Sequence, residues 1–251
     1  MNHLIFLKSQ HCQGNELHRS SHQYEVRNFD QLEHLNKVLK VKIGQKFKAI
    51  LIAEGLCVAS CLEIKENSII FELNQFKEAE KRTFDLLIGL ARPQSLKKVL
   101  EYAAGQPVGR IHFFKAELSE KSYSTSKIFD LENLNKILHQ GLSQCGRFDT
   151  IPDITIHTSF PNELISNYQN KYILSLKSKT SITGIPSIED EHFTSPPLFA
   201  FGPERGFTDS ELNKFESLGF HDILLSKSIL RVETAVIALC AQLELLSLDK
   251  K

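Results

Sequence analysis

The sequence predicts an α/β protein with a smaller β-rich unit at its amino-terminal end. Two observations carry this prediction. Short apolar runs separated by turn residues fill residues 47–73, whereas from residue 83 onward apolar strands alternate with helices that carry one apolar face. A chain of 251 residues is long enough for one large domain or two modest ones.

The amino-terminal part predicts several short strands around one helix, which is typical of a small β-barrel or β-sandwich. The expected elements are a strand over 4–7, a polar loop over 8–23, a helix over 31–40, and strands over 47–52, 56–62 and 68–73. In the helix, Leu32, Leu35, Val38 and Leu39 are expected to share one apolar face. A charged segment over 74–82 is the predicted linker. The predicted domains are therefore residues 1–76 and residues 77–251.

The carboxy-terminal part has the alternation expected of βαβ units. Strands are predicted over 83–90, 109–115, 154–156, 172–176, 198–201 and 221–225. Helices are predicted over 93–104, within 126–145, over 162–168, from Thr208 to Gly219, and over 231–246. The polar stretch 177–196 is expected to be an exposed loop.

Composition restricts the possible functions. The chain is 41% hydrophobic and 24% charged, and its 30 basic and 30 acidic residues cancel. A nonspecific nucleic-acid binder usually has a clear positive net charge, and this chain has none. The first 50 residues, however, carry eight Lys/Arg against four Asp/Glu. A solvated surface explains this local excess as well as RNA binding does.

The five cysteines have no CxxC pair and no zinc-ligand spacing, so free thiols and no metal site are expected. The apolar run at 4–7 is too short for a signal peptide, and no run approaches the roughly 20 residues that cross a bilayer. These features predict a cytoplasmic protein without membrane contact.

The stretch from Leu198 to Leu246 is the most informative. It reads as strand, Gly202-Pro203 loop, capping-box helix, strand, loop and helix. In open α/β sheets, ligands bind beyond the carboxyl ends of the strands, so the two loops after the two strands form a candidate site. An ordinary βαβα unit with tight turns explains the pattern equally well.

Two segments of this stretch carry a family resemblance. They are FGPERGF at 201–207 and ILRVETA at 229–235, in that order. The pair resembles the signature of bacterial 16S ribosomal RNA uridine-N3 methyltransferases, which belong to the SPOUT superfamily. The resemblance covers nearly the whole chain. It implies a trefoil-knotted α/β methyltransferase domain behind a PUA-like β-barrel, S-adenosylmethionine as the cofactor, 16S ribosomal RNA of the small subunit as the substrate, and a homodimer.

The resemblance also implies site residues. The residues that it implies for cofactor binding are Leu176, Phe201, Gly202, Leu225, Ser226, Ile229 and Leu230. Those carried over to catalysis are Arg231, Glu204 and Thr234. The residues that it implies for RNA binding are Lys37, Lys40, Arg147 and Arg231. Arg147 could instead brace the dimer, and a structural salt bridge explains it equally well.

Each catalytic candidate has an alternative interpretation. Arg231 begins a helix, where a cation opposes the macrodipole, which suggests an external anionic partner; it could instead pair with Glu204 or Glu233. Glu204 orients Arg231 or caps a nearby backbone N–H. Thr234 donates a hydrogen bond at the site or faces the helix groove.

The chain departs from the family pattern at Arg205 and Ser226, where glycines are usual. If position 205 requires a positive φ, Arg205 is strained or the loop differs. The alternative functions are a related methyltransferase that acts on another RNA nucleotide, or a non-catalytic RNA-binding ribosome-assembly factor with the same fold. An unrelated nucleotide-binding protein is disfavoured because the chain has neither a P-loop nor a GxGxxG motif.

Overall fold

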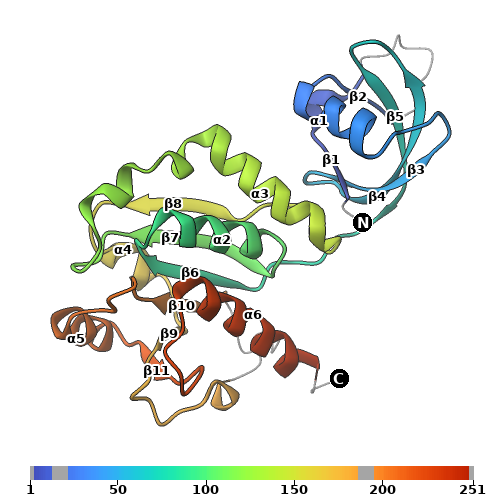
Figure 1. Cartoon of the computed structure of the whole chain (residues 1–251). Coiled ribbons are helices and arrows are strands. Elements are labelled where there is room, and N and C mark those ends of the chain that lie inside the picture. The colour runs from blue at the N-terminus through green and yellow to red at the C-terminus, as the bar shows by residue number, and fades with distance from the viewer. Residues whose placement is uncertain (1–2, 13–21, 186–194, 249–251) are drawn as a thin grey trace. The chain divides into compact units, whose positions relative to one another are not determined.

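The structure is a computed structural model that describes residues 3–12, 22–185 and 195–248 (Figure 1). It divides into two compact units, Met1–Glu80 with Leu142–Thr150, and Lys81–Gly141 with Ile151–Lys251. The predicted division into 1–76 and 77–251 stays a proposal. Of the loop predicted over 177–196, residues 186–194 lie outside the described residues.

The first unit contains a curved sheet with strand order β1-β3-β4-β5-β2. Its strands are β1 (Leu4–Phe6), β2 (Gln23–Val26), β3 (Lys46–Leu51), β4 (Gly55–Ile64) and β5 (Ile69–Lys77). His11 pairs with Tyr24, and the amide of Cys12 donates to the carbonyl of Gln23, so the chain beyond β1 reaches the outer edge of β2. The sheet thereby curls toward a barrel, and apolar side chains from all of these strands fill its interior.

The predicted helix over 31–40 forms with a change in pitch. It is α1 (Phe29–Glu33) followed by a π-helical turn over His34–Val38. A π-turn takes more residues than an α-turn and so rotates the side chains that follow it. Leu35 is buried as expected, whereas Val38 is 66% exposed. The prediction that Val38 shares the apolar face was therefore wrong.

The second unit is an α/β domain around a sheet with strand order β11-β9-β10-β6-β7-β8, in which every neighbouring pair is parallel. Its strands are β6 (Phe84–Gly89), β7 (Val108–Phe114), β8 (Asp153–His157), β9 (Lys171–Leu174), β10 (Leu198–Phe201) and β11 (His221–Ile223). Its helices are α2 (Pro93–Ala104), α3 (Leu131–Cys145, whose last turn belongs to the first unit), α4 (Asn162–Ser166), α5 (Asp209–Ser217) and α6 (Val232–Leu248). The predicted α/β class is confirmed.

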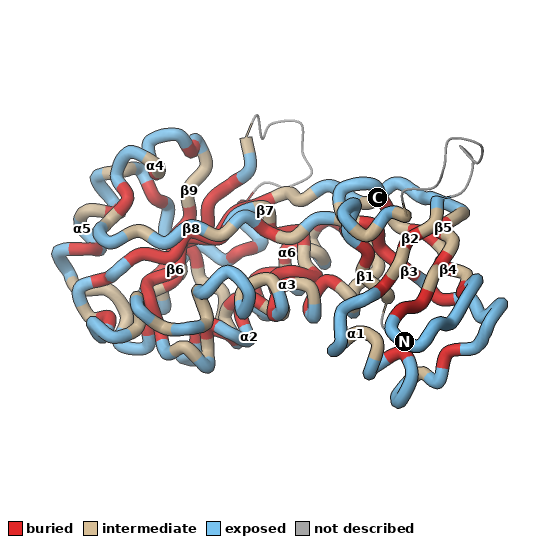
Figure 2. Tube along the Cα trace, turned by 90° about the horizontal axis from the view of Figure 1, so that it is seen from above, coloured by how far each residue is buried: buried red, intermediate tan, exposed pale blue. Residues whose placement is uncertain are grey.

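Helices cover both faces of this sheet (Figures 1 and 2). α2, α3 and α6 pack on one face around buried side chains such as Leu96, Ile137 and Val236. α4 and α5 cover the other face around Ile165 and Phe215. Figure 2 shows the buried residues concentrated along the strands and the inward sides of these helices. This three-layer packing buries both sheet faces at the central strands β6 and β10, as is usual for parallel sheets, whereas the edge strands β8 and β11 keep exposed residues.

The first part of the connection from β9 to β10 pairs with the outer edge of β11. The amide of Leu224 donates to the carbonyl of Thr180 at 2.7 Å, and the carbonyl of Leu224 accepts from the amide of Ile182 at 3.2 Å. The backbone of Ile223 forms its hydrogen bond on the opposite side of β11, the side that faces β9. The described start of this connection thus lies on the side of β11 that faces away from β9, whereas β10, to which the connection leads, lies on the other side of β9. This pairing accords with the knot that the resemblance implies.

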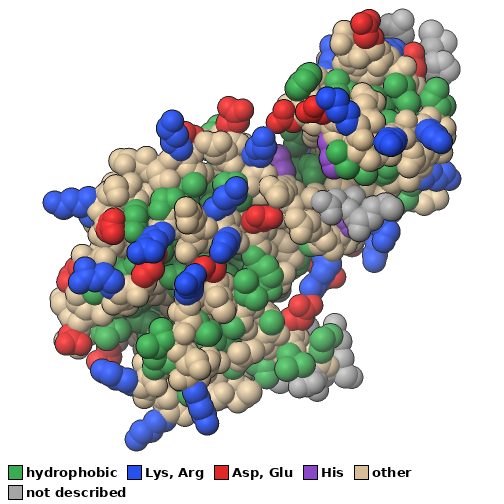
Figure 3. Space-filling model, viewed as in Figure 1, with side chains coloured by type: hydrophobic (Ala, Val, Ile, Leu, Met, Phe, Trp, Pro, Cys, Tyr) green, Lys and Arg blue, Asp and Glu red, His purple; other side chains and the backbone are tan. Residues whose placement is uncertain are grey.

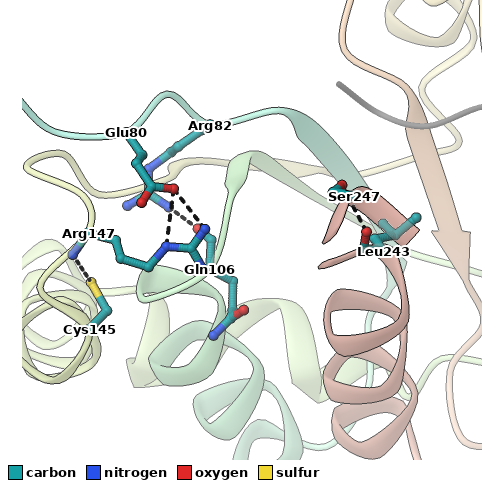
Figure 4. Close-up of polar contacts among 7 residues, drawn as sticks. All are labelled: Glu80, Arg82, Gln106, Cys145, Arg147, Leu243 and Ser247. Carbon is teal, nitrogen blue, oxygen red and sulfur yellow. Dashed lines mark hydrogen bonds and ion pairs between the residues drawn. The ribbon is translucent and has the colours of Figure 1, made fainter. Parts of the chain in front are cut away.

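Polar caps fix the ends of two helices. The predicted capping box of α5 is confirmed, with the amide of Glu211 donating to Thr208 Oγ1 at 3.2 Å and Glu211 Oε2 accepting from the amide of Thr208 at 3.0 Å. At the carboxyl end of α2, the Arg82 guanidinium donates to the carbonyls of Ala104 and Gln106 (Figure 4). A cation there complements the helix dipole.

A buried polar cluster lies near the amino ends of β6 and β7. Asp85, which is 2% exposed, accepts from the hydroxyl of Tyr168 at 2.7 Å and from the amide of Arg110 at 2.8 Å. His112 Nε2 lies 3.2 Å from the same hydroxyl. Burial, with smaller contributions from His157 and Arg110, lowers the pKa of His112 to about 4. The imidazole is therefore neutral at pH 7.

Lowering the pH should destabilise the protein through His112. The unfolded chain binds a proton on this imidazole near pH 6.5, but the folded chain does so only near pH 4, so the free energy of unfolding falls across that interval. The full contribution is about 3 kcal/mol. Urea unfolding at both ends of the interval should show a smaller loss for His112→Gln than for the wild type. Equal losses in the wild type, in His112→Gln and in the exposed control His221→Gln would contradict this assignment.

Adding a methyl group at Gly141 should loosen the packing of α3 on α2. A Cβ there would overlap the backbone carbonyl oxygen of Glu101, which cannot move aside as a side chain can. Alanine is otherwise the better helix former by up to about 1 kcal/mol, but overpacking costs about 1–3 kcal/mol. We expect Gly141→Ala to lower the urea midpoint clearly, whereas Gly184→Ala, whose nearest neighbour is a side-chain methyl, changes it little. A variant as stable as the wild type would refute this packing.

Candidate cofactor and catalytic site

The candidate site lies where three neighbouring parallel strands end. β11, β9 and β10 are adjacent in the sheet, so the loops that follow them meet at one edge. These loops and the strand ends line a cavity of about 360 Å³. Its lining comprises residues 174–176 at the end of β9, residues 201–204 and 206 at the end of β10, residues 225, 226 and 228–231 after β11, and Val232 and Ala235 of α6. The topology therefore forms the site that the sequence predicts at strand ends.

The cavity walls are mostly apolar and open to solvent. Leu174, Leu225 and Leu230 contribute partly buried side chains, while Leu176 is 52% exposed and Ile229 is 87% exposed. Exposed aliphatic side chains at the mouth of a cavity indicate a surface that a ligand covers. Between them, the loops also present backbone N–H and C=O groups.

All of the residues predicted to bind the cofactor line this cavity. They are Leu176, Phe201, Gly202, Leu225, Ser226, Ile229 and Leu230. Phe201 is buried at the end of β10 and supports the floor. The structure thus brings together residues that are up to 54 positions apart in the chain, from 176 to 230. Their assignment to a cofactor remains a proposal.

The loop after β10 is tightly folded on itself. A Cβ at Gly202 would lie 3.1 Å from the Cα of Gly206, so position 202 has little room for a side chain. Gly206 has φ +72°, a conformation that glycine adopts without strain. Arg205 is not among the described non-glycine residues with positive φ. The departure from glycine at 205 therefore causes no backbone strain, because the residue after it takes the left-handed conformation.

Glu204 connects this loop to α2. Its Oε1 accepts a hydrogen bond of 2.7 Å from the backbone amide of Arg92, the residue that precedes α2. A carboxylate at this position satisfies an amide at the helix start and complements the macrodipole. Of the interpretations of Glu204, the structure shows the backbone cap. The same loop packs through Pro203 against Gly89, where a Cβ would lie 2.7 Å from the proline Cδ.

Arg231 stands at the junction between the third loop and α6. It is exposed, it lines the cavity, and its carbonyl accepts from the amide of Ala235 at 2.8 Å, which starts the helix. Of its two expected partners, Glu204 is bonded to Arg92, and Glu233 is buried with Lys98 at 3.8 Å. Within the described part of the chain, Arg231 forms no ion pair. Its guanidinium is therefore available to a ligand.

Thr234 lies outside the cavity lining. It is exposed on the first turn of α6, whereas Val232 and Ala235 are the helix residues that face the cavity. Successive helix residues are about 100° apart, so the position between two lining residues points elsewhere. The structure brings Arg231 and Glu204 to the cavity but not Thr234.

Comparison with known proteins places the chain among RNA methyltransferases. The model of a family described as an RNA methyltransferase domain matches residues 78–244. The ribosomal RNA small subunit methyltransferase E 1 of Borreliella burgdorferi is 32% identical over 213 residues, which are 82% of this chain and 86% of that protein. The ribosomal RNA small subunit methyltransferase E of Treponema pallidum is 30% identical over 217 residues, which are 83% of this chain and 80% of that protein.

The chain belongs to the ribosomal RNA small subunit methyltransferase E family. The crystal structure of a member from Neisseria gonorrhoeae, bound to S-adenosyl methionine, superposes with a TM-score of 0.76. That comparison covers 98% of both chains at 17% identity, and it confirms the fold class. The family resemblance stated from the two signature segments is thus confirmed.

The RNA-binding candidates of this family member lie in different settings. In the first unit, Lys37 pairs with Glu33 at 2.7 Å, one helical turn away, and Lys40 adopts φ 48°. Arg147 forms an ion pair of 2.7 Å with Glu80 (Figure 4), and its guanidinium lies 5.4 Å from the centroid of the Phe148 ring. For Arg147, the structure shows the salt bridge that the sequence left as an alternative to RNA contact.

Sequence reasoning missed Tyr123, which lies beside Arg92. Desolvation raises the pKa of Tyr123, and a side-chain hydrogen bond with Arg92 acts in the opposite direction. No periodic signal in the sequence points to this contact, because Arg92 and Tyr123 lie 31 positions apart. Among the described residues, no helix is long and apolar enough to span a membrane, and no cluster of His, Cys, Asp or Glu is arranged to hold a metal ion.

Removing the Glu204 carboxylate should weaken the start of α2. We expect Glu204→Ala to lower the free energy of unfolding by about 1 kcal/mol, the typical effect of losing a helix cap. Glu204→Gln should retain part of this stability, because the side-chain amide oxygen can accept the same hydrogen bond from the backbone amide of Arg92. Urea unfolding of the two variants measures the difference. Wild-type stability of Glu204→Ala would show that the bond contributes nothing.

Proposed function

We propose that the protein transfers the methyl group of S-adenosylmethionine to N3 of a uridine in the 16S RNA of the small ribosomal subunit. One observation carries the proposal. The loops after β9, β10 and β11 form a single cavity, and its lining contains all of the residues assigned to the methyl donor. The names of the two bacterial relatives support ribosomal RNA of the small subunit as the substrate class.

The cavity suits a nucleoside-type donor. Its volume of about 360 Å³ lies within the range of about 300–1,000 Å³ that is usual for small-molecule sites. The apolar walls can enclose an adenine ring; they come from Leu176, Leu225, Ile229 and Leu230. The backbone N–H and C=O groups of the loops can form hydrogen bonds with the edges of that ring. The bound donor in the Neisseria gonorrhoeae structure, which has the same fold, supports this choice.

The chemistry needs a base with an accessible N3 and a way to stabilise the negative charge of the deprotonated imide. The uridine must be unpaired for N3 to be reachable. S-adenosylmethionine supplies an electrophilic methyl group on a sulfonium. Arg231, exposed at the cavity and without an ion pair among the described residues, is placed to bind the uracil oxygens and stabilise their developing charge. A bound donor and base would displace water from this open cavity and so strengthen that interaction.

The outer face of α6 supports the proposed homodimer. Ile237, Leu245 and Leu248 are 41%, 56% and 62% exposed, and their spacing places them on one side of the helix. A second copy of the chain would cover this stripe. We also place the protein in the cytoplasm, where its proposed ribosomal substrate is assembled.

Replacing Arg231 should separate donor binding from methyl transfer. With labelled S-adenosylmethionine and small ribosomal subunits that lack the mark, Arg231→Ala should lower kcat/KM by about 10²–10³-fold, the usual effect of losing a group that stabilises transition-state charge. Donor affinity, measured by calorimetry, should change much less.

Arg205→Ala is the matched control, because Arg205 is an exposed arginine on the neighbouring loop but does not line the cavity. It should retain activity close to that of the wild type. Donor binding without transfer to uridine N3 in the wild type would favour another RNA nucleotide as the target. A wild type that binds no donor would favour the assembly-factor alternative.

A further inference from the structure

A second cavity lies between α2 and α3, apart from the donor cavity. It has a volume of about 240 Å³. The ammonium-bearing residues that line it are Lys97 from α2, Lys127 from the turn before α3, and Lys136 from α3. Asn133 and Gln140 contribute amide groups. The lining combines cations, amides and aliphatic side chains, and it contains no Asp or Glu among the described residues.

The pocket is built by helix geometry. Asn133, Lys136, Ile137 and Gln140 are spaced by three and four residues, so they share one face of α3. That face is turned toward α2, because Ile137 is buried in the core that α2 and α3 share.

The turn that carries Lys127 is fixed to α3. Asn133 Nδ2 donates to the carbonyl of Lys127 at 2.9 Å, which ties the residue before the helix to its first turn. Ile128 and Ile137 form an apolar floor, along which lysine stems can lie while their ammonium groups reach the opening. The positions of the cations thus follow from packing.

Three cations around one cavity depart from the balance of the whole chain, whose 30 basic and 30 acidic residues cancel. Figure 3 shows Lys and Arg side chains, with a few acidic ones among them, over the face formed by α2 and α3. Lysine ammonium groups bind phosphate as point charges, and Asn and Gln amides add N–H donors. Such contacts position a nucleic acid through its backbone without reading its sequence.

We propose that this pocket binds a backbone phosphate of the RNA substrate. The inference rests on the proposed function and extends it to a positioning site for the RNA. Its location suits that role. Lys97 lies five residues beyond Arg92, about one and a half turns along α2, and Arg92 is the residue whose amide holds Glu204 of the donor-cavity loop. α2 therefore carries one lysine of this pocket and begins next to the residue that holds the donor-cavity loop.

The test is filter binding of small-subunit ribosomal RNA, transcribed in vitro, to the full-length protein over a series of KCl concentrations. We expect the double variant K127Q/K136Q to bind about tenfold more weakly at low salt, with a slope of log affinity against log salt that is smaller by about 1–2. K171Q is the matched control, because Lys171 begins β9 at the opposite end of the strand from the donor cavity. It should retain the wild-type slope.

Each outcome decides the proposal. Equal affinity and slope in K127Q/K136Q and the wild type would overturn it, as would an equal loss in K171Q, which would indicate a general electrostatic effect. If inorganic phosphate raises the Tm of the wild type but not of the double variant, while RNA binding is equal in both, the pocket holds free anions and the proposal is overturned. RNA binding is measured here without methyl transfer. A failure of the proposed reaction can therefore be told apart from a failure of the proposed phosphate site.

Discussion

The parallel pairing of β11, β9 and β10 is the interaction on which the candidate site depends. It brings three loops from distant parts of the chain to one edge of the sheet. The pairing is reinforced from outside, because Leu224 bonds through both backbone groups to Thr180 and Ile182, which belong to the connection between β9 and β10. A change that frees this connection would disturb two of the three cavity walls together, since the loop after β9 begins the connection and Leu224, next to the loop after β11, is bonded to it.

The cavity is tied to the rest of the domain by polar contacts at helix starts. Glu204 caps α2 through Arg92, and Glu211, buried in the capping box of α5, also accepts from the amide of Glu117 at 2.9 Å. Each carboxylate therefore joins a loop near the cavity to a second segment. Such contacts let a mostly irregular site keep its shape, because the loop ends are attached to rigid helices. Arg231 is the exception, since its guanidinium remains free of ion pairs within the described structure.

Much of this arrangement could be predicted from the sequence, and the reasons for the rest are physical. The alternating pattern predicted the α/β sheet, and the family resemblance pointed to seven residues that line the cavity, although Thr234 of the second signature segment lies outside it. The pattern could not show that Glu204 bonds an amide 112 positions away, because long-range backbone contacts leave no periodic signal. It also placed Val38 on an apolar face, because a π-turn changes the rotation per residue without changing the composition. The lysine pocket escaped notice for a similar reason, since its members come from three separate segments.

Calorimetric titration of S-adenosylmethionine into the wild type and Gly202→Val tests the central claim most directly. If the three loops form the donor site, the wild type binds the donor, and Gly202→Val loses most of that affinity, because its side chain would press on the backbone of Gly206 at 3.1–3.2 Å and displace the loop. Unfolding measurements on both proteins would show that the variant is folded. A wild type that binds no donor, or a folded Gly202→Val that binds it equally well, would contradict the assignment of this cavity.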